Sequence, residues 1–318
     1  MSFEKITGKF KSSNGSDNIA YYVYKPVSKP RAAVQIVHGM CEYLERYEDF
    51  IGFLCSNGIL VFGHDHLGHG KSVVSDEYLG YFAPKRGWQF LAKDTVRLTR
   101  IMQKQYSDIP YFILGHSMGS LVTRTVLAKH CDLYSGAVIM GTLNTRTAAD
   151  AGILMMRTIC RIKGEFSRSR VADGIVFGMN NARIEDPINE YAWVSRDDEI
   201  VTKYGNDPLC TFHFTARAYS DLFFLSSYVS GRDWAGKVDN GLPILVCSGG
   251  DDPIGRYGKG PEEVFNRLNE SGQEDVELKI YSGARHELLN ETNRAEVYED
   301  VMEWLDEHIG RTVDGDVR

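Results

Sequence analysis

The sequence contains no long hydrophobic run. Its longest apolar stretches, such as residues 59–62 and 243–247, are far shorter than the roughly 20 residues that a membrane-spanning helix needs. Residues 1–11 alternate charged and apolar side chains and lack the apolar core of a signal peptide. We therefore expect a protein without membrane spans and with a cytoplasmic location.

Cysteine is scarce, and basic residues are not in excess. The six cysteines are scattered through 318 residues and never form C-x-x-C, so we expect reduced thiols and neither a disulfide framework nor a zinc site. Because 43 acidic residues oppose 36 basic ones, the formal net charge is −7. The chain as a whole has no field that attracts phosphate backbones, and we expect no nucleic-acid partner.

The sequence does contain a regular alternation of short β-rich apolar runs with segments of helical period. Six runs rich in Val, Ile, Leu and Phe predict strands at residues 32–39, 59–65, 111–117, 135–141, 243–249 and 276–282. Two earlier runs, 3–11 and 19–25, predict a hairpin around Asn14-Gly15. The pattern is typical of an α/β protein with a mostly parallel sheet and helices on both faces.

This alternation stops between residues 142 and 240, where aromatic, Met and Arg residues are frequent. We predict a core of residues 1–141 and 241–318, interrupted by a helical cap over 142–240. The aromatic residues of the cap suit an apolar pocket wall, or equally the core of a helical subdomain. They are Trp193, Tyr204, Phe212, Phe214, Tyr219, Phe223, Phe224 and Tyr228.

One cap segment combines an apolar stripe with basic residues. The stripe consists of Ala151, Leu154, Met155, Thr158, Ile159 and Ile162, and the basic residues are Arg157, Arg161, Lys163, Arg168 and Arg170. Such a segment can contact a membrane surface transiently, or it can form a solvated face or a homodimer contact. On an acidic protein we favour the solvated face or dimer contact, and the sequence leaves the oligomeric state open.

The strongest local signal is Gly115-His116-Ser117-Met118-Gly119, between a predicted strand and a helical segment from Leu121. In a G-x-S-x-G turn the serine hydroxyl is lifted out of the sheet, and the flanking glycines are needed because a Cβ there would clash. The alternative is an ordinary helix N-cap. We predict that Ser117 is a nucleophile.

A serine hydroxyl needs a base to take its proton and a carboxylate to orient that base, in the chain order Ser, Asp or Glu, His. His286 follows the predicted strand 276–282, and Asp251-Asp252 follows the predicted strand 243–249. These positions lie at the carboxyl ends of parallel strands, where open α/β sheets place their sites. His286 is the predicted base, whereas the residues alone leave Asp251 and Asp252 as alternatives for the acid.

A developing oxyanion needs backbone donors from the residue after the nucleophile and from the loop after an earlier strand. Met118 and Met40 occupy these positions. Cys41, beside Met40, is interpreted as a small buried hydrophobe. His64, Asp65, His66 and His69 are close in sequence, but they fit a structural glycine-rich loop better than a metal site, so we predict no metal and no cofactor.

Together these segments resemble the α/β-hydrolase superfamily, and within it the monoacylglycerol lipase or lysophospholipase-like branch, which is often labelled serine aminopeptidase. The resemblance rests on His38-Gly39-Met40 with Glu42 and Arg46-Tyr47, on residues 65–72, on Gly115 to Gly119, on Asp252-Pro253-Ile254-Gly255 and on residues 283–287. It implies the α/β-hydrolase fold and the aspartate before proline, Asp252, as the triad acid. Leu67 departs from the family pattern, which commonly has Arg there.

The predicted function is a serine hydrolase that cleaves carboxylic esters through an acyl-enzyme. The apolar cap and the resemblance favour a monoacylglycerol or lysophospholipid, a small-molecule ester with an apolar acyl chain. One alternative is an aminopeptidase or amidase with the same triad, in which a pocket acid such as Glu165, Glu185 or Glu190 binds a free amino terminus. A non-catalytic binding protein on the same fold is the other alternative, and the complete triad disfavours it.

Overall fold

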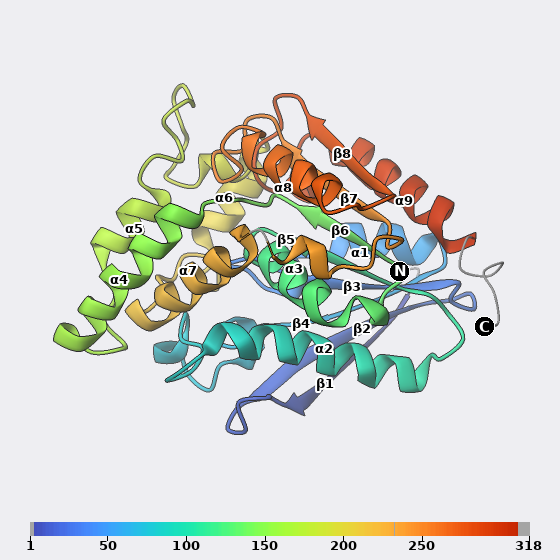
Figure 1. The fold of residues 1–318 in the computed structure, drawn as a ribbon, viewed down its shortest axis with the longest axis horizontal. Coiled ribbons are helices and arrows are strands. Elements are labelled where there is room, and N and C mark those ends of the chain that lie inside the picture. Colours follow the sequence, from blue (N-terminus) through green and yellow to red (C-terminus); the bar gives the residue numbers. More distant parts are fainter. Residues whose placement is uncertain (1–2, 232, 311–318) are drawn as a thin grey trace.

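An eight-stranded sheet runs through the centre of the computed structural model, which describes residues 3–231 and 233–310 (Figure 1). The spatial order is β1-β2-β4-β3-β5-β6-β7-β8. Strands β3 to β8 are parallel, whereas β1 and β2 form an antiparallel hairpin that joins the sheet at β4. The strands are β1 (Phe3–Lys11), β2 (Asn18–Pro26), β3 (Ala32–Val37), β4 (Ile59–His64), β5 (Tyr111–His116), β6 (Gly136–Met140), β7 (Ile244–Gly249) and β8 (Val276–Tyr281).

Helices cover both faces of the sheet. Alternate residues of one strand point to opposite faces, so Ala33 and Val37 of β3 join one buried cluster while Val34 and Ile36 join the other. The first cluster includes side chains of α2 (Gly87–Gln105), α3 (Met118–His130) and α8 (Lys259–Glu270). The second includes α1 (Glu48–Ser56) and α9 (Arg294–Ile309).

The predicted fold class is therefore confirmed, and so are the hairpin and the six parallel strands. Some ends differ. The strand predicted to reach residue 39 ends at Val37, because His38 and Gly39 leave the sheet in a loop. The helix after Ser117 begins at Met118, three residues before the predicted start, because the sharp turn at Ser117 leads directly into it.

Between β6 and β7 the chain forms α4 (Arg146–Lys163), α5 (Arg170–Phe177), α6 (Asp198–Asn206) and α7 (Ala216–Ser230). Figure 1 shows these helices gathered beyond one end of the sheet, with α4 packed along α7. Arg124 of α3, fully buried, donates to the carbonyl oxygens of Leu143 and Val229, and so links α3 to both ends of this segment. None of the helices in the described ranges combines the length and apolar character that crossing a membrane requires.

Helix α4 buries a different face from the apolar stripe noted in its sequence. Ala149, Gly152, Ile153 and Met156 are its buried residues. Leu154 and Ile162 of the stripe are instead 70% and 75% exposed. Met155 and Ile159 of the stripe are partly buried against the core, and the packing of α7 on the neighbouring face leaves Leu154 and Ile162 outside.

Candidate active site

Ser117 lies in the turn between β5 and α3 with φ 54° and ψ −120°, a conformation that is strained for an L-residue. The two glycines of the motif make this turn sterically possible. A Cβ at Gly119 would collide with the carbonyl oxygens of Val37 and His38, and one at Gly115 would collide with Thr123. The hydroxyl of Ser117 is thereby placed at the carboxyl end of the sheet, as the motif predicted.

The structure brings His286 and Asp252 to this serine. His286 Nε2 lies 2.9 Å from Ser117 Oγ, and its Nδ1 lies 3.0 Å from Asp252 Oδ2. Asp252 is fully buried, and its other oxygen accepts the Ile254 N–H at 2.9 Å. Asp251 is exposed, and no hydrogen bond joins its carboxylate to a described residue. Of the two adjacent aspartates, only Asp252 contacts the imidazole.

The loop after β3 runs beside the serine. A Cβ at Gly39 would approach Ser117 Cβ to 2.9 Å, so only glycine allows this close passage. The Met40 N–H makes no hydrogen bond to any described residue, and Met118, as the first residue of α3, has no helical partner for its N–H. Both backbone donors are thus free. The neighbouring Cys41 thiol is buried, which raises its pKa well above the usual value and makes it a poor nucleophile.

Behind the site lies a buried charged network that the sequence reasoning did not assign. Glu42 Oε1 accepts hydrogen bonds from the Gly39 N–H and, at 2.9 Å, from the Tyr47 hydroxyl, and it lies 3.0 Å from His116 Nδ1. Burial alone would raise the pKa of Glu42, but His116 and Arg46 hold it below its usual range. Although burial lowers the pKa of His116, its pairing with Glu42 raises the pKa overall.

The same network reaches the catalytic-histidine candidate. Arg46 makes two hydrogen bonds to Glu287, at 2.6 and 2.8 Å, and His116 Nε2 lies 3.2 Å from the His286 carbonyl oxygen. The network therefore joins the Gly39 loop to the His286 loop. All residues of this network lie in or beside the motifs that carry the family resemblance. Their position in these motifs is the only feature of the sequence that could have pointed to the network.

Buried histidine rings cluster where β3 and β4 end. The ring centroids of His38 and His66 are 4.4 Å apart, and those of His64 and His66 are 4.9 Å apart. Asp65 accepts from the Leu44 N–H at 3.1 Å and the Tyr22 hydroxyl at 2.9 Å. Among the described residues, no group of three or more His, Cys, Asp or Glu side chains is arranged to hold a metal ion.

The Ser117 hydroxyl opens into a small cavity of about 80 Å³. Its wall is mostly apolar, with Met40, Leu121, Leu143, Val176, Phe177, Trp193, Val194, Leu222 and Ile254 among the lining residues. A second cavity of about 310 Å³ shares Phe177, Trp193 and Tyr204 with it. The second cavity also exposes polar side chains, among them Asp173, Asn181 and Glu190.

The cap residues proposed from sequence are distributed unevenly around these cavities. Trp193, Tyr204 and Phe212 line one or both of them, whereas Phe214 and Tyr219 are fully buried in the core. Of the three acidic candidates, only Glu190 lines either cavity. Glu165 accepts a hydrogen bond from Tyr81 at 3.2 Å, and Glu185 is exposed. Leu67, which replaces the Arg common in the family, is buried.

A mostly parallel sheet with these residues at its carboxyl edge defines an α/β hydrolase. The family model for serine aminopeptidase, S33, matches residues 28–293. The chain belongs to this family.

Three similar proteins cover almost the whole chain. Monoglyceride lipase from Mus musculus is 27% identical over 298 residues, which span 90% of this chain and 86% of that protein. Monoacylglycerol lipase from Mycolicibacterium smegmatis is 28% identical over 296 residues, 93% of this chain and 95% of that protein. The crystal structure of a thermostable carboxyl esterase from Bacillus coagulans, in complex with glycerol, has a TM-score of 0.89 at 33% identity and covers 97% of this chain and 99% of that chain.

Proposed function

We propose that this protein is a carboxylic ester hydrolase of the lipase type that acts on monoacylglycerols or lysophospholipids. The observation that carries the proposal is the hydrogen-bonded series Asp252, His286, Ser117 at the end of an apolar cavity. The similarity to monoglyceride lipases and to a carboxyl esterase supports an ester rather than an amide as the substrate.

In the proposed mechanism Ser117 Oγ attacks the ester carbonyl carbon while His286 Nε2 takes the hydroxyl proton. Asp252 orients the imidazole and stabilises its charged form. The N–H groups of Met40 and Met118 donate to the oxygen that becomes negative. His286 then gives the proton to the leaving alcohol, and water, activated by the same imidazole, hydrolyses the acyl-enzyme. No step uses a metal ion or an organic cofactor.

We assign residues 142–240 to a cap that covers the site. This cap supplies Val176, Trp193 and Leu222 to the apolar wall, against which the acyl chain would lie. The polar side chains of the adjoining cavity suit the alcohol part of the substrate. The cap also holds the loop of the base in place through two backbone hydrogen bonds. The backbone N–H of His286 donates to the Trp193 carbonyl oxygen, and that of Glu287 donates to the Val194 carbonyl oxygen.

The cap also carries a contact surface for the membranes in which such lipids reside. Leu154 and Ile162 of α4, with Val171, Ile175 and Met179, are all at least 60% exposed. An apolar surface of this kind favours transient membrane contact or a homodimer. We propose transient membrane contact, in place of the solvated face favoured from sequence, because the exposed residues are large and apolar. The cytoplasmic location stays a prediction.

Aminopeptidase activity is the second candidate, since Glu190 in the adjoining cavity offers one carboxylate for a substrate amino group. Both functions are tested with p-nitrophenyl esters of increasing chain length beside aminoacyl p-nitroanilides. We expect ester turnover that increases with acyl length and is about 10⁴-fold lower or more in Ser117→Ala. Ester turnover that survives this substitution would contradict the mechanism. Anilide turnover above ester turnover would favour the peptidase.

A further inference from the structure

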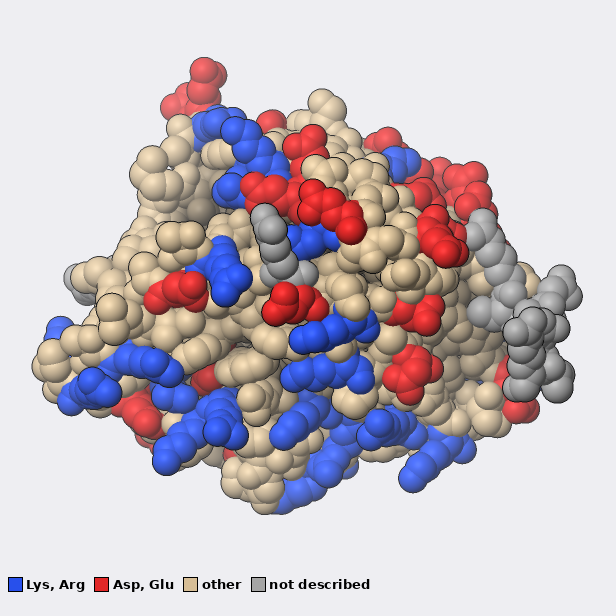
Figure 2. Space-filling model, viewed as in Figure 1, with Lys and Arg blue, Asp and Glu red and all other residues tan. Residues whose placement is uncertain are grey.

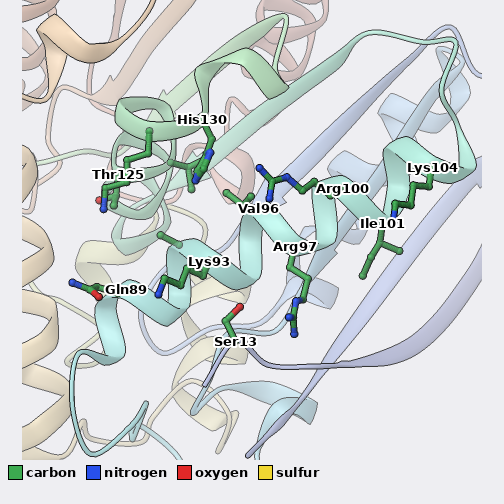
Figure 3. Close-up of a pocket in the computed structure, with 13 residues that line it drawn as sticks. Ser13, Gln89, Lys93, Val96, Arg97, Arg100, Ile101, Lys104, Thr125 and His130 are labelled. Carbon is green, nitrogen blue, oxygen red and sulfur yellow. The ribbon is translucent and has the colours of Figure 1, made fainter. Parts of the chain in front are cut away.

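A groove between α2 and α3 has a composition that the ester-hydrolase proposal does not explain. It has a volume of about 480 Å³ and shares no lining residue with the cavity at Ser117 (Figure 3). Its floor is apolar, formed by Ala92, Val96 and Val126. The hydrogen-bonding side chains of Ser13, Gln89 and Thr125 also line it.

The rim of this groove is strongly basic. Lys93, Arg97, Arg100 and Lys104 recur at i, i+4, i+7 and i+11, so they share one face of α2, and all four are exposed. Lys129 and His130 extend the rim on α3. In Figure 3 the Arg100 side chain extends from α2 toward His130 across the groove. Figure 2 shows Lys and Arg side chains gathered in a band along the lower part of this face, where α2 lies.

No described carboxylate forms an ion pair with these cations, although Arg97 is close enough to Asp94 to oppose the rise in pKa that burial causes in that carboxyl. Among the described residues that line the groove, none is Asp or Glu, and the five Lys and Arg side chains of the rim form no ion pair with a described carboxylate. The only acidic residue of α2, Asp94, is buried and accepts hydrogen bonds from Ser12 and Ser13. A local excess of five positive charges therefore lies on a protein whose formal net charge is −7.

The cations also repel one another. Like charges at i and i+4 on a helix destabilise it. The pKa of Lys129 is lowered by burial and by the nearby charges of Lys93 and Lys237. Burial and Arg100 likewise lower the pKa of His130. A multivalent anion in the groove would remove this repulsion.

We propose that the groove between α2 and α3 binds an anion that carries two or more phosphate groups. A phosphate group carries a charge of about −1.5 to −2 at pH 7, so a single one would leave most of the five cations uncompensated. From Lys93 to Lys104 the row spans about 16 Å of helix, long enough for several phosphates. Arg100 can pair with phosphate oxygens through two parallel hydrogen bonds, whereas Arg97 Nη1 already donates to the Lys11 carbonyl oxygen. The volume is that of a site for a small molecule.

The first test uses sodium tripolyphosphate as the probe in isothermal titration calorimetry. The groove variant is Lys93→Gln, Arg100→Gln, Lys129→Gln. The matched control is Lys29→Gln, Lys203→Gln, Lys259→Gln, which removes three exposed positive charges from residues that do not line the groove. We expect the groove variant to bind at least about tenfold more weakly than wild type, and the control to bind within about twofold of wild type. Equal weakening in both variants would overturn the proposal, because it would trace binding to net charge.

A second measurement separates a binding site from a structural role. Without ligand, the groove variant should unfold at the same or a higher temperature than wild type, because it relieves repulsion. Tripolyphosphate should raise the unfolding temperature of wild type and of the control variant, and leave that of the groove variant unchanged. A groove variant that is less stable without ligand would overturn the proposal, since the cations would then be structural.

The phosphate groups can come from a soluble molecule or from lipid headgroups, and a flotation assay distinguishes the two. Vesicles of phosphatidylcholine alone are compared with vesicles that also contain a phosphatidylinositol bisphosphate, a lipid whose headgroup carries more than one phosphate group. If tripolyphosphate binds but wild type and the groove variant float equally, the ligand is a soluble molecule. If wild type floats with the anionic vesicles more than the groove variant does, the ligand is a lipid headgroup. Failure of both probes overturns the proposal. Ester turnover uses none of these residues, so its outcome is independent.

Discussion

Ser117 and its two glycines show how one residue is held in a strained conformation by its surroundings. The positive φ of Ser117 is maintained because β5 enters the turn and α3 leaves it in fixed positions. Gly119 is pressed against the carbonyl oxygens of Val37 and His38, so any larger residue would displace the loop after β3. Ser117, the proposed nucleophile, and the loop that carries Met40 are therefore positioned by the same contact.

The two adjacent aspartates provide a direct test of the proposed acid. Asp252→Asn keeps the size of the side chain but removes the charge that orients His286, and we expect kcat to fall by about 10⁴-fold. Asp251→Asn changes an exposed carboxylate and should leave kcat within about twofold. The measurement is steady-state hydrolysis of a p-nitrophenyl ester, with thermal unfolding as the control for folding. Loss of activity in the Asp251 variant alone would refute the assignment.

Glu42 is expected to act as a positioning residue. Glu42→Gln removes the charge that pairs with His116 and alters the acceptor for the Gly39 N–H, so the Met40 donor should shift. We expect kcat to fall roughly 10- to 100-fold with little change in KM, because an oxyanion donor acts mainly in the transition state. The control is Glu45→Gln. Glu45 lies three residues further along the chain, and its partly exposed side chain pairs with Lys5 and Lys71. If Glu42→Gln instead raised KM by 10- to 100-fold and left kcat unchanged, this role would be contradicted.

At the scale of elements, the segment between β6 and β7 is attached to the core at a few defined points. Arg124 binds carbonyl oxygens at both ends of the segment, and Arg285 donates to the Ala192 and Ser195 carbonyl oxygens at 2.7 and 2.8 Å. The second contact lies next to His286. Movement of this segment would therefore displace the loop that carries His286, the proposed base.

Helix α4 gives the prediction that belongs to this scale. Leu154→Ser, Ile162→Ser removes two of the exposed apolar side chains from the proposed membrane contact. We expect about tenfold slower hydrolysis of a monoacylglycerol presented in vesicles, and an unchanged rate on a short soluble ester. Val27→Ser, Val74→Ser, at positions that are 87% and 72% exposed outside the cap, is the matched control. A vesicle rate that equals wild type would exclude this surface, and a concentration-dependent change in mass would favour the homodimer.

For the whole molecule, four buried histidines make the folded protein less stable in acid. His38, His64, His66 and His69 all have a pKa lowered by burial, to about 3 for His64 and for His69. Below the ordinary value of 6.5 the unfolded chain binds these protons and the folded protein does not, so stability is lost as the pH falls from 6.5 toward 3. Each such histidine contributes about 1.4 kcal/mol per pH unit. Asp221, whose pKa burial raises to about 6, opposes this change with one proton.

This prediction is measured as the urea midpoint at pH 7.5, 6 and 5. We expect the midpoint to fall with pH, and to fall less steeply in His64→Phe, which removes one buried imidazole from a site lined by the rings of Phe10 and His66. An identical pH dependence in wild type and His64→Phe would show that His64 does not take part.

The sequence by itself determined the order of the strands and the positions of Ser117 and His286 after two of them. Apolar runs of strand length and helical stripes are local properties, and the G-x-S-x-G turn is specified by glycines that no other residue can replace there. These features do not depend on distant parts of the chain. The amino-acid sequence is therefore sufficient to predict them.

Only the tertiary structure decided which aspartate meets His286, which face of α4 is buried, and how Glu42, Arg46, His116 and Glu287 form one network. Neighbouring side chains point in different directions, and a partner 241 residues away, as between Arg46 and Glu287, leaves no local pattern. The basic groove between α2 and α3 also depends on contacts between distant parts of the chain. Four of its cations come from one exposed face of α2, and Lys129 and His130 come from the end of the otherwise buried α3. They surround one groove because α2 packs against α3.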